Sequence, residues 1–352
     1  MDTLQIETPR LPPAVRGPVP TSAEAGLPPG YVLDGRFRIA ETLGRSRMAT
    51  IYRAEDIADG YRPIAVKVPL QKVEHDPAWF ARFLREQAMG ARFDHPQLVK
   101  FLPTPSHQSR PYLVMEFLPG RTLAQVLGDA RPLPEARAFR IASGACTALR
   151  HMHIRGVVHC DLKPSNLMIA DDGTVRLLDF GLAAAPERRR RLLGSLGTIF
   201  GTPEYMAPEQ VRQGFADERS DIYSLGAILF ELLTGEVPFR REDPWESAYA
   251  RLNGDPVAPR QLNPSVSPVA EEIVLHALQR RPGDRYASVA AFQAELDAPE
   301  RVPITGYRER LQAPRWRMSF QATPIAAGLV LGLAVVAALV GLFFVLRFSL
   351  ER

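Results

Sequence analysis

Cysteine is scarce in this sequence, since Cys146 and Cys160 are the only two in 352 residues. Their separation fits no metal-binding spacing, and two thiols are too few for a disulfide framework. The sequence therefore predicts a protein of a reducing compartment such as the cytosol, held together by a hydrophobic core. Hydrophobic residues make up 46% of the chain, which is enough apolar content for two lobes or domains.

A strong excess of either charge is also missing. The 43 Lys and Arg residues nearly balance the 39 Asp and Glu residues, and the formal net charge is only +4. Such a balance does not indicate binding to the phosphate backbone of nucleic acid, so we expect no nucleic-acid partner.

The first thirty residues lack the apolar segment of a signal peptide and carry Asp2, Glu7 and Arg10. Seven prolines occur in the same stretch. Proline-rich composition without apolar periodicity predicts a disordered leader over residues 1–30.

Long apolar runs are missing until residues 324–346, which contain no charged side chain. As a helix these 23 residues would extend about 34 Å at roughly 1.5 Å per residue, enough to cross a hydrocarbon core of about 30 Å. A buried core helix is the alternative. Four arginines lie between positions 308 and 317 and only two follow the run, which predicts a cytoplasmic location for the N-terminal bulk. We expect a single-pass transmembrane helix at 324–346, a juxtamembrane linker at 298–323 and a short tail at 347–352.

The chain between leader and anchor changes its pattern once. Residues 31–117 consist of short alternating segments typical of strands, with one helical stretch over 76–93, and helical patterns dominate residues 118–297. This order predicts an α+β architecture with a β-rich N-lobe at 31–117, a helical C-lobe at 118–297, and a cleft between them.

A compact polar cluster follows in the second lobe. Asp161, Lys163 and Asn166 lie within six residues, and Asp179 follows thirteen residues after Asn166. Amide and carboxylate oxygens suit Mg²⁺, while a further carboxylate can accept a proton and a lysine can neutralise a transferring phosphoryl group. The alternative is a turn whose polar side chains bond only to their own backbone.

The first lobe contains two weaker signals. Lys67 stands in the apolar segment IAVKVPL, and Glu86, nineteen residues later, is a possible partner; two unrelated surface charges are the alternative. The segment LGRSRMATIYRA has the form of a strand–turn–strand whose backbone amides could cover phosphates. Of three glycines in G-x-G-x-x-G only Gly44 is present, with Ser46 and Ala49 in the other places.

Together these segments resemble the eukaryotic-type protein kinases. Among these, the chain is most similar in its general sequence character to the membrane-anchored serine/threonine kinases of bacteria. The similarity covers residues 31–296 and rests on motifs in the family's order: AVK at 65–67, Glu86, HPQLV at 95–99, VMEFLPG at 114–120, HCDLKPSN at 159–166, DFG at 179–181, GTPEYMAPE at 201–209, SDIYSLG at 220–226 and RPGDRY with Arg285. The resemblance implies a bilobal protein-kinase-like fold.

The resemblance also implies residue roles. Lys67 would hold the α- and β-phosphates of ATP and pair with Glu86, Asp161 would be the catalytic base and Lys163 would contact the γ-phosphate. Asn166 and Asp179 would hold Mg²⁺ or Mn²⁺. Backbone groups of Glu116 and Leu118 would bind adenine behind Met115, and the implied nucleotide site comprises Leu43, Gly44, Arg45, Ser46, Arg47, Met48, Ala49, Thr50, Ile51, Ala65, Lys67, Met115, Glu116 and Leu118. The implied substrate platform and its supports comprise Thr202, Glu209, Asp221 and Arg285.

Three positions depart from the family pattern. The glycine loop has side chains where backbone should approach phosphate. Cys160 replaces the arginine that normally receives an activation-loop phosphate, although Ser195, Thr198 and Thr202 remain as acceptors. Gly90 stands where relatives have a bulky apolar side chain that stacks toward Phe180, which predicts an apolar column short of one member and an easily displaced helix. The arginines at 188–191 are either a solvated segment or a site for phosphate, anionic lipid or an acidic partner.

These features favour an ATP-dependent protein serine/threonine kinase on the cytoplasmic face of a membrane, with protein substrates as partners. The alternative is a pseudokinase scaffold, which the glycine loop and Gly90 favour. The small residues Gly328 and Gly332 also allow a homodimer through the anchor.

Overall fold

The computed structural model describes residues 26–46, 48–74, 77–180, 183, 203–240 and 243–312. The predicted transmembrane helix at 324–346 and nearly all of the predicted leader lie outside these residues. None of the helices in the described part is both long enough and apolar enough to cross a bilayer.

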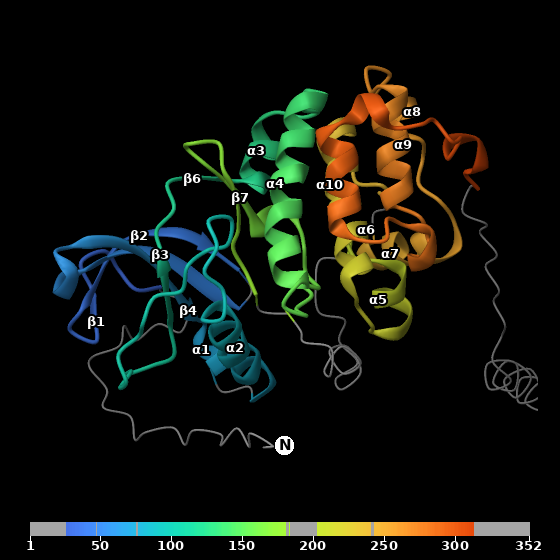
Figure 1. Ribbon diagram of the computed structural model, residues 1–352. Helices are drawn as coiled ribbons and strands as arrows, with labels where there is room; N and C mark the ends of the chain where they lie inside the picture. Colours follow the sequence, from blue (N-terminus) through green and yellow to red (C-terminus); the bar gives the residue numbers. More distant parts are fainter. Residues whose placement is uncertain are drawn as a thin grey trace, which may run out of the picture. The chain divides into compact units, whose positions relative to one another are not determined.

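The first lobe is built on a five-stranded antiparallel sheet in the order β1-β2-β3-β4-β5 (Figure 1). The strands are β1 (Val32–Leu33), β2 (Phe37–Arg45), β3 (Ala49–Asp56), β4 (Arg62–Pro69) and β5 (Leu113–Glu116). Burial alternates along β3, as expected for a strand with one face on a core. That core contains Leu33, Phe37, Tyr52, Val66 and Val114.

Two helices follow β4, α1 (Gln71–Glu74) and α2 (Pro77–Gly90). The helix expected within 76–93 is therefore confirmed. Phe83, Glu86 and Gly90 are all buried, and their spacing places them on one face of α2. A carboxylate on a buried helix face is stable only beside a cation, so Glu86 must meet a positively charged side chain from a neighbouring element.

The second lobe is mainly helical. Its helices are α3 (Leu123–Asp129), α4 (Glu135–His153), α5 (Pro208–Gln213), α6 (Glu218–Thr234), α7 (Pro244–Asn253), α8 (Pro259–Leu262), α9 (Pro268–Ala277) and α10 (Val289–Asp297). Every residue of α6 from Ser220 to Thr234 is buried, and the apolar residues on all sides of this helix explain its central place. Helices α4 and α10 lie side by side in Figure 1.

A small three-stranded sheet interrupts the helical lobe, in the order β6 (Gly120–Thr122), β7 (Leu167–Ala170) and β8 (Val175–Leu177). Strands β7 and β8 form a hairpin between the two polar segments predicted to carry the chemistry. The amide of Val99 donates to the carbonyl of Leu177 over 2.9 Å, which ties this hairpin to the loop before β5. The predicted α+β arrangement, with the strand-rich part first, is confirmed. Short 3₁₀ turns occur at Ile57–Asp59, Pro164–Asn166, Pro282–Asp284, Pro299–Arg301 and Arg308–Arg310.

Residues 298–312 pack against α9. The buried carboxylate of Glu272 accepts hydrogen bonds from the backbone amides of Thr305 at 2.6 Å and Tyr307 at 3.3 Å. Tyr307 stacks on His276 with ring centroids 5.1 Å apart. Beyond them, the backbone of Gln312 exchanges two hydrogen bonds of 2.9 Å with Asp255. The first half of the expected juxtamembrane linker is thus part of the folded lobe.

We predict that Glu272→Gln lowers the free energy of unfolding by about 1–2 kcal/mol, because one amide oxygen cannot satisfy all the donors that the carboxylate accepts. The melting temperature should fall by roughly 2–4 °C per kcal/mol, measurable by circular dichroism. The control is Glu300→Gln, since Glu300 is 70% exposed and pairs with the exposed Arg301 on the surface. Equal melting temperatures for the two variants would show that residues 305–307 do not stabilise the lobe.

Candidate active site

The ion pair between Lys67 and Glu86 joins the sheet to α2. Lys67 Nζ lies 2.6 Å from Glu86 Oε1 and 3.4 Å from Asp179 Oδ2. The side chains of Lys67 and Glu86 are only 15% and 5% exposed. Two unrelated surface charges would not meet under such burial, so that alternative is wrong. The pair also brings Asp179, over a hundred residues away in sequence, beside the strand of Lys67.

The polar loop that begins at His159 has its own internal hydrogen bonds. Lys163 Nζ lies 2.8 Å from Asp161 Oδ2, and Asn166 Nδ2 donates to the carbonyl oxygen of Asp161 over 2.9 Å. The amide of Leu178 donates to the carbonyl of Asn166 over 2.9 Å, which holds the segment of Asp179 against this loop. The four polar residues predicted to act together are therefore brought together.

The donor set fits a hard divalent cation. Asn166 uses its side-chain nitrogen within the loop, so its oxygen is the atom that remains for a metal. That oxygen and the Asp179 carboxylate are ligands of the kind that Mg²⁺ prefers, and Mg²⁺ takes few protein ligands. Among the described residues no three His, Cys, Asp or Glu side chains form a closed metal cage. Asn166 and Asp179 are therefore the residues that would hold such an ion.

Asp221, near the start of α6, holds the loop in place. Its carboxylate accepts the backbone amides of His159 and Cys160, both over 2.9 Å, and lies 2.8 Å from His153 Nε2. Burial raises the pKa of Asp221, but the His153 contact and the backbone donors outweigh it and leave the pKa below its usual value. Asp221 is therefore ionised at neutral pH, as its predicted support of the loop requires.

Cys160 adopts a left-handed backbone conformation with φ of 68°, which is strained for a residue with a side chain. Its amide is held by Asp221, and its carbonyl accepts from Gln210 Nε2 over 2.8 Å. Gln210 is 3% exposed and was missed by sequence reasoning; its only signal is its place directly after Glu209. Both backbone groups of Cys160 are thus held by buried side chains of the second lobe.

The predicted partnership of Glu209 and Arg285 is present as a two-pronged ion pair. Arg285 Nη1 and Nη2 each donate to a Glu209 oxygen over 2.8 Å, and the Arg285 side chain is 0% exposed. Ser220 Oγ donates to the same carboxylate over 2.6 Å. The pair fixes the start of α5 to the segment after α9.

Arg251 is a second residue that sequence reasoning missed. It lies on α7, is 1% exposed, and its guanidinium donates to the backbone carbonyls of Met206 and, over 3.1 Å, Glu204. Burial lowers the pKa of Arg251. The sequence alone predicts that an arginine in an amphipathic helix lies on the surface. The structure shows instead that Arg251 is buried and holds the segment before α5.

The predicted nucleotide residues lie on adjacent strands. Leu43, Gly44 and Arg45 are on β2, Ala49, Thr50 and Ile51 on β3, Ala65 and Lys67 on β4, and Met115 and Glu116 on β5, with Leu118 just beyond. The registers Gly44 with Ile51, Ile51 with Lys67, and Ala65 with Met115 join them into one patch of the sheet.

The β2–β3 turn is closed by the side chain of Ser46. Its hydroxyl oxygen accepts the backbone amides of Met48 at 3.2 Å and Ala49 at 3.0 Å. These are amides that the sequence assigns to phosphate binding. In this conformation the serine hydroxyl is the acceptor of both amides.

The prediction that Gly90 leaves the apolar column short of one member is wrong. The ring of Phe101 occupies the space where a side chain on residue 90 would lie, and its centroid is 5.8 Å from that of Phe180. The Lys67–Glu86 pair forms with this packing in place.

Several predicted residues lie outside the described part of the chain: Arg47, Gly181, Thr202, the possible phosphorylation sites Ser195 and Thr198, and the arginines at 188–191.

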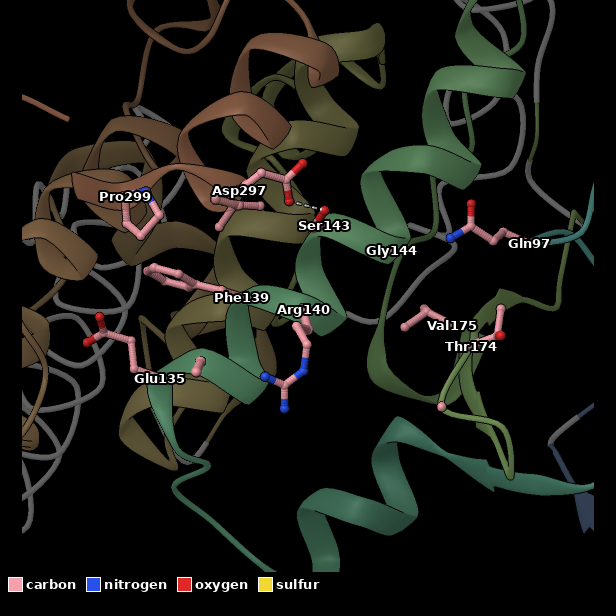
Figure 2. A pocket seen from close by; sticks show the side chains of 13 residues that line it. Gln97, Glu135, Phe139, Arg140, Ser143, Gly144, Thr174, Val175, Asp297 and Pro299 are labelled. Carbon is pink, nitrogen blue, oxygen red and sulfur yellow. Dashed lines mark hydrogen bonds between the residues drawn. The ribbon is translucent and has the colours of Figure 1, made fainter. Parts of the chain in front are cut away.

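A pocket of about 650 Å³ lies away from the site, against α4, the turn before β8 and the end of α10 (Figure 2). Ser143 Oγ donates to Asp297 Oδ1 over 2.6 Å at its edge. None of the predicted catalytic or nucleotide residues lines it.

A β-rich lobe that carries a lysine–glutamate pair, followed by a helical lobe with an Asp–Lys–Asn loop, defines the protein kinase class of fold and site. The family described as protein kinase domain matches residues 37–296. The chain belongs to this family, among the eukaryotic-type serine/threonine kinases of bacteria.

Similar proteins include the serine/threonine-protein kinases PknB of Mycolicibacterium smegmatis and of Mycobacterium leprae, each 36% identical to this chain. The matches cover 80% and 75% of this chain but only 47% and 43% of those proteins. The serine/threonine-protein kinase PknL of Mycobacterium tuberculosis is 36% identical over 81% of this chain and 70% of its own length. The chain thus spans about half or less of the length of the PknB proteins that it matches.

We predict that Ser46→Gly lowers the KM for ATP by about threefold to tenfold, because the amides of Met48 and Ala49 lose their two hydrogen bonds to the hydroxyl and become free for phosphate, a net gain of roughly 1 kcal/mol. Steady-state phosphorylation kinetics measure the change. Ser46→Ala is the matched control, since it removes the hydroxyl without adding backbone freedom, and the two variants should agree. An unchanged KM in both would mean that the hydroxyl does not compete with phosphate.

We predict that Asp221→Asn lowers the free energy of unfolding by about 2–3 kcal/mol at pH 7, because an amide cannot replace the charged acceptor. The folded-state pKa is depressed, so this contribution is present above the ordinary value of 3.8 and is lost as the pH falls below it. Urea unfolding should therefore show the two proteins converging in acid. The exposed Asp129, paired with Arg121 on the surface, supplies the control Asp129→Asn. A gap that stays constant below pH 3.8 would contradict the assignment.

Proposed function

We propose that this protein is an ATP-dependent protein serine/threonine kinase that transfers the γ-phosphate of ATP to hydroxyl groups of protein substrates. The observation that carries the proposal is the buried Lys67–Glu86 pair with Asp179 at 3.4 Å from the same ammonium group. A scaffold without catalysis has no need to bury an ion pair beside a further carboxylate, because burial of charge is costly.

Phosphoryl transfer depends mainly on positioning and on electrostatic stabilisation, and each residue has a place in that scheme. Lys67, oriented by Glu86, binds the α- and β-phosphates. Asp161 orients the attacking hydroxyl and accepts its proton, while Lys163, 2.8 Å from Asp161, neutralises charge on the γ-phosphate. Mg²⁺ or Mn²⁺, held by Asn166 and Asp179, would supply charge neutralisation between the phosphates. Backbone groups of Glu116 and Leu118 bind adenine.

We further propose that residues 324–346 tether the kinase to a membrane with residues 31–297 on the cytoplasmic side, and that two copies associate through Gly328 and Gly332. These proposals rest on the apolar run, the arginines before it and the small residues within it. Protein serine or threonine is the proposed acceptor because the DLKPSN and GTPEY segments resemble those of serine/threonine kinases.

A pseudokinase scaffold is the second candidate. The observation that favours it is the Ser46 hydroxyl on the amides of Met48 and Ala49, which disfavours tight phosphate binding. The two candidates differ in whether phosphate is transferred.

The test uses the full chain in detergent with labelled ATP and Mg²⁺, beside Asp161→Asn and the surface control Asp129→Asn. We expect phosphoserine and phosphothreonine in the parent and in the control, and a loss of about a hundredfold or more in Asp161→Asn with ATP binding retained. Parent protein that binds a partner but transfers no phosphate would support the scaffold. Phosphotyrosine alone would refute the proposed acceptor.

A further inference from the structure

Arg251 is a buried cation whose hydrogen-bond partners are backbone carbonyls. It lies on α7, and Ser247 and Ala250 are buried on the same face of that helix. The guanidinium donates to the carbonyl oxygens of Met206 and, over 3.1 Å, of Glu204. In the part of the chain that the structure describes, no carboxylate forms an ion pair with it, and its Nε atom is buried without a partner. Arginine stays charged in proteins, so this burial has a desolvation cost that no opposite charge offsets.

The segment that Arg251 holds is fixed at three successive carbonyls. Between the two carbonyls bonded to Arg251, that of Tyr205 accepts from Ser224 Oγ of α6 over 2.8 Å. The Tyr205 hydroxyl donates to Glu231, also on α6, over 2.6 Å. Side chains from two helices thus hold one short segment of irregular backbone, directly before α5 begins at Pro208.

The same segment is joined to the loop of the predicted catalytic base. Gln210 Oε1 accepts the amide of Ala207 over 2.9 Å, and Gln210 Nε2 donates to the carbonyl of Cys160 over 2.8 Å. Cys160 directly precedes Asp161. A displacement of residues 204–206 would therefore change their position relative to Asp161, and none of these contacts involves the sheet of the first lobe.

We propose that Arg251 is a positioning residue for the protein acceptor, which acts through the backbone of residues 204–206. This inference rests on the proposed kinase function, in which the segment at 201–209 belongs to the substrate platform. Held from α7 and α6, residues 204–206 present one backbone shape to the acceptor and direct its hydroxyl to Asp161. Without Arg251 two carbonyls would face a buried helix without donors, and the backbone would have to move to find new partners.

Positioning and mere structural support predict different kinetics. A variant that only loses stability contains less folded enzyme, so its apparent kcat falls while both KM values stay at those of the parent. A variant whose platform has moved binds the acceptor poorly, so the KM for the acceptor rises. The KM for ATP should stay unchanged, because the predicted nucleotide residues lie outside the segment and outside α7.

The experiment compares Arg251→Met with the parent as full chains in detergent. The acceptor is the threonine peptide that the parent phosphorylates best in a degenerate library. Methionine keeps the apolar stem but donates no hydrogen bond, so we expect the KM for the peptide to rise by about tenfold to thirtyfold and the KM for ATP to change by less than about twofold. Arg251→Lys keeps a charged donor that reaches one carbonyl, and it should raise the peptide KM by only about threefold to fivefold.

Two control variants separate this contact from the packing of its helix and from loss of charge. Ser247→Ala removes the hydroxyl that donates to the carbonyl of Phe239, one turn before Arg251, so it weakens the packing of α7 without touching residues 204–206. Arg137→Met removes an exposed arginine of α4. Both should keep the parental KM for the peptide. A parental value in Arg251→Met, or an equal rise in Ser247→Ala, would overturn the inference.

The proposed function and this inference fail in different ways. A parent that transfers no phosphate to any peptide refutes the function. Hydrogen exchange of the amides within 203–210 then tests the contact, and it should be at least about tenfold faster in Arg251→Met than in Ser247→Ala. Equal exchange in these two variants would overturn the inference in an active or an inactive protein. Arg251→Lys serves for both measurements if Arg251→Met does not fold.

Discussion

The contact between Lys67 and Glu86 is the constraint on which the site depends. A buried ion pair adds little net stability, because removal of two charges from water costs nearly as much as their attraction returns. Its effect is specificity of arrangement, since neither charge tolerates burial without the other. Sheet and helix α2 are thus held at one separation, 2.6 Å between Nζ and Oε1, and Asp179 reaches the same ammonium group.

In the second lobe, buried polar side chains hold the loops in place by hydrogen bonds to their backbone amides and carbonyls. Asp221 gathers two loop amides, Gln210 holds the carbonyl of Cys160, and Arg251 holds carbonyls before α5. Each is a buried polar side chain that satisfies irregular backbone, which would otherwise lack partners. A loop without regular hydrogen bonding keeps one shape in this way, even at Cys160 with its left-handed φ of 68°.

The contact of Gly90 with Phe101 shows how a departure from a family pattern can be compensated by packing. A missing side chain on one element is matched by a ring from another, 11 positions later in the chain. Interiors are packed to a nearly uniform density, so bulk lost at one position can be supplied from any direction in space. An inference drawn from residue 90 alone therefore overlooks the ring that fills its place.

Much of this protein follows from its sequence. The alternation of short strands, the helical periodicity of α2 and the spacing of Asp161, Asn166 and Asp179 are local patterns, and they predicted the order of the lobes and the residues of the site. The partners of those residues were decided only by the tertiary structure. Four contacts could not be predicted from the local sequence pattern of the residues that make them. They are Phe101 beside Gly90, Ser46 on the amides of its own turn, Arg251 on the segment before α5, and residues 305–307 on α9. Periodicity records which face of an element is apolar, whereas the identity of the side chain that meets it depends on how distant segments fill the same space.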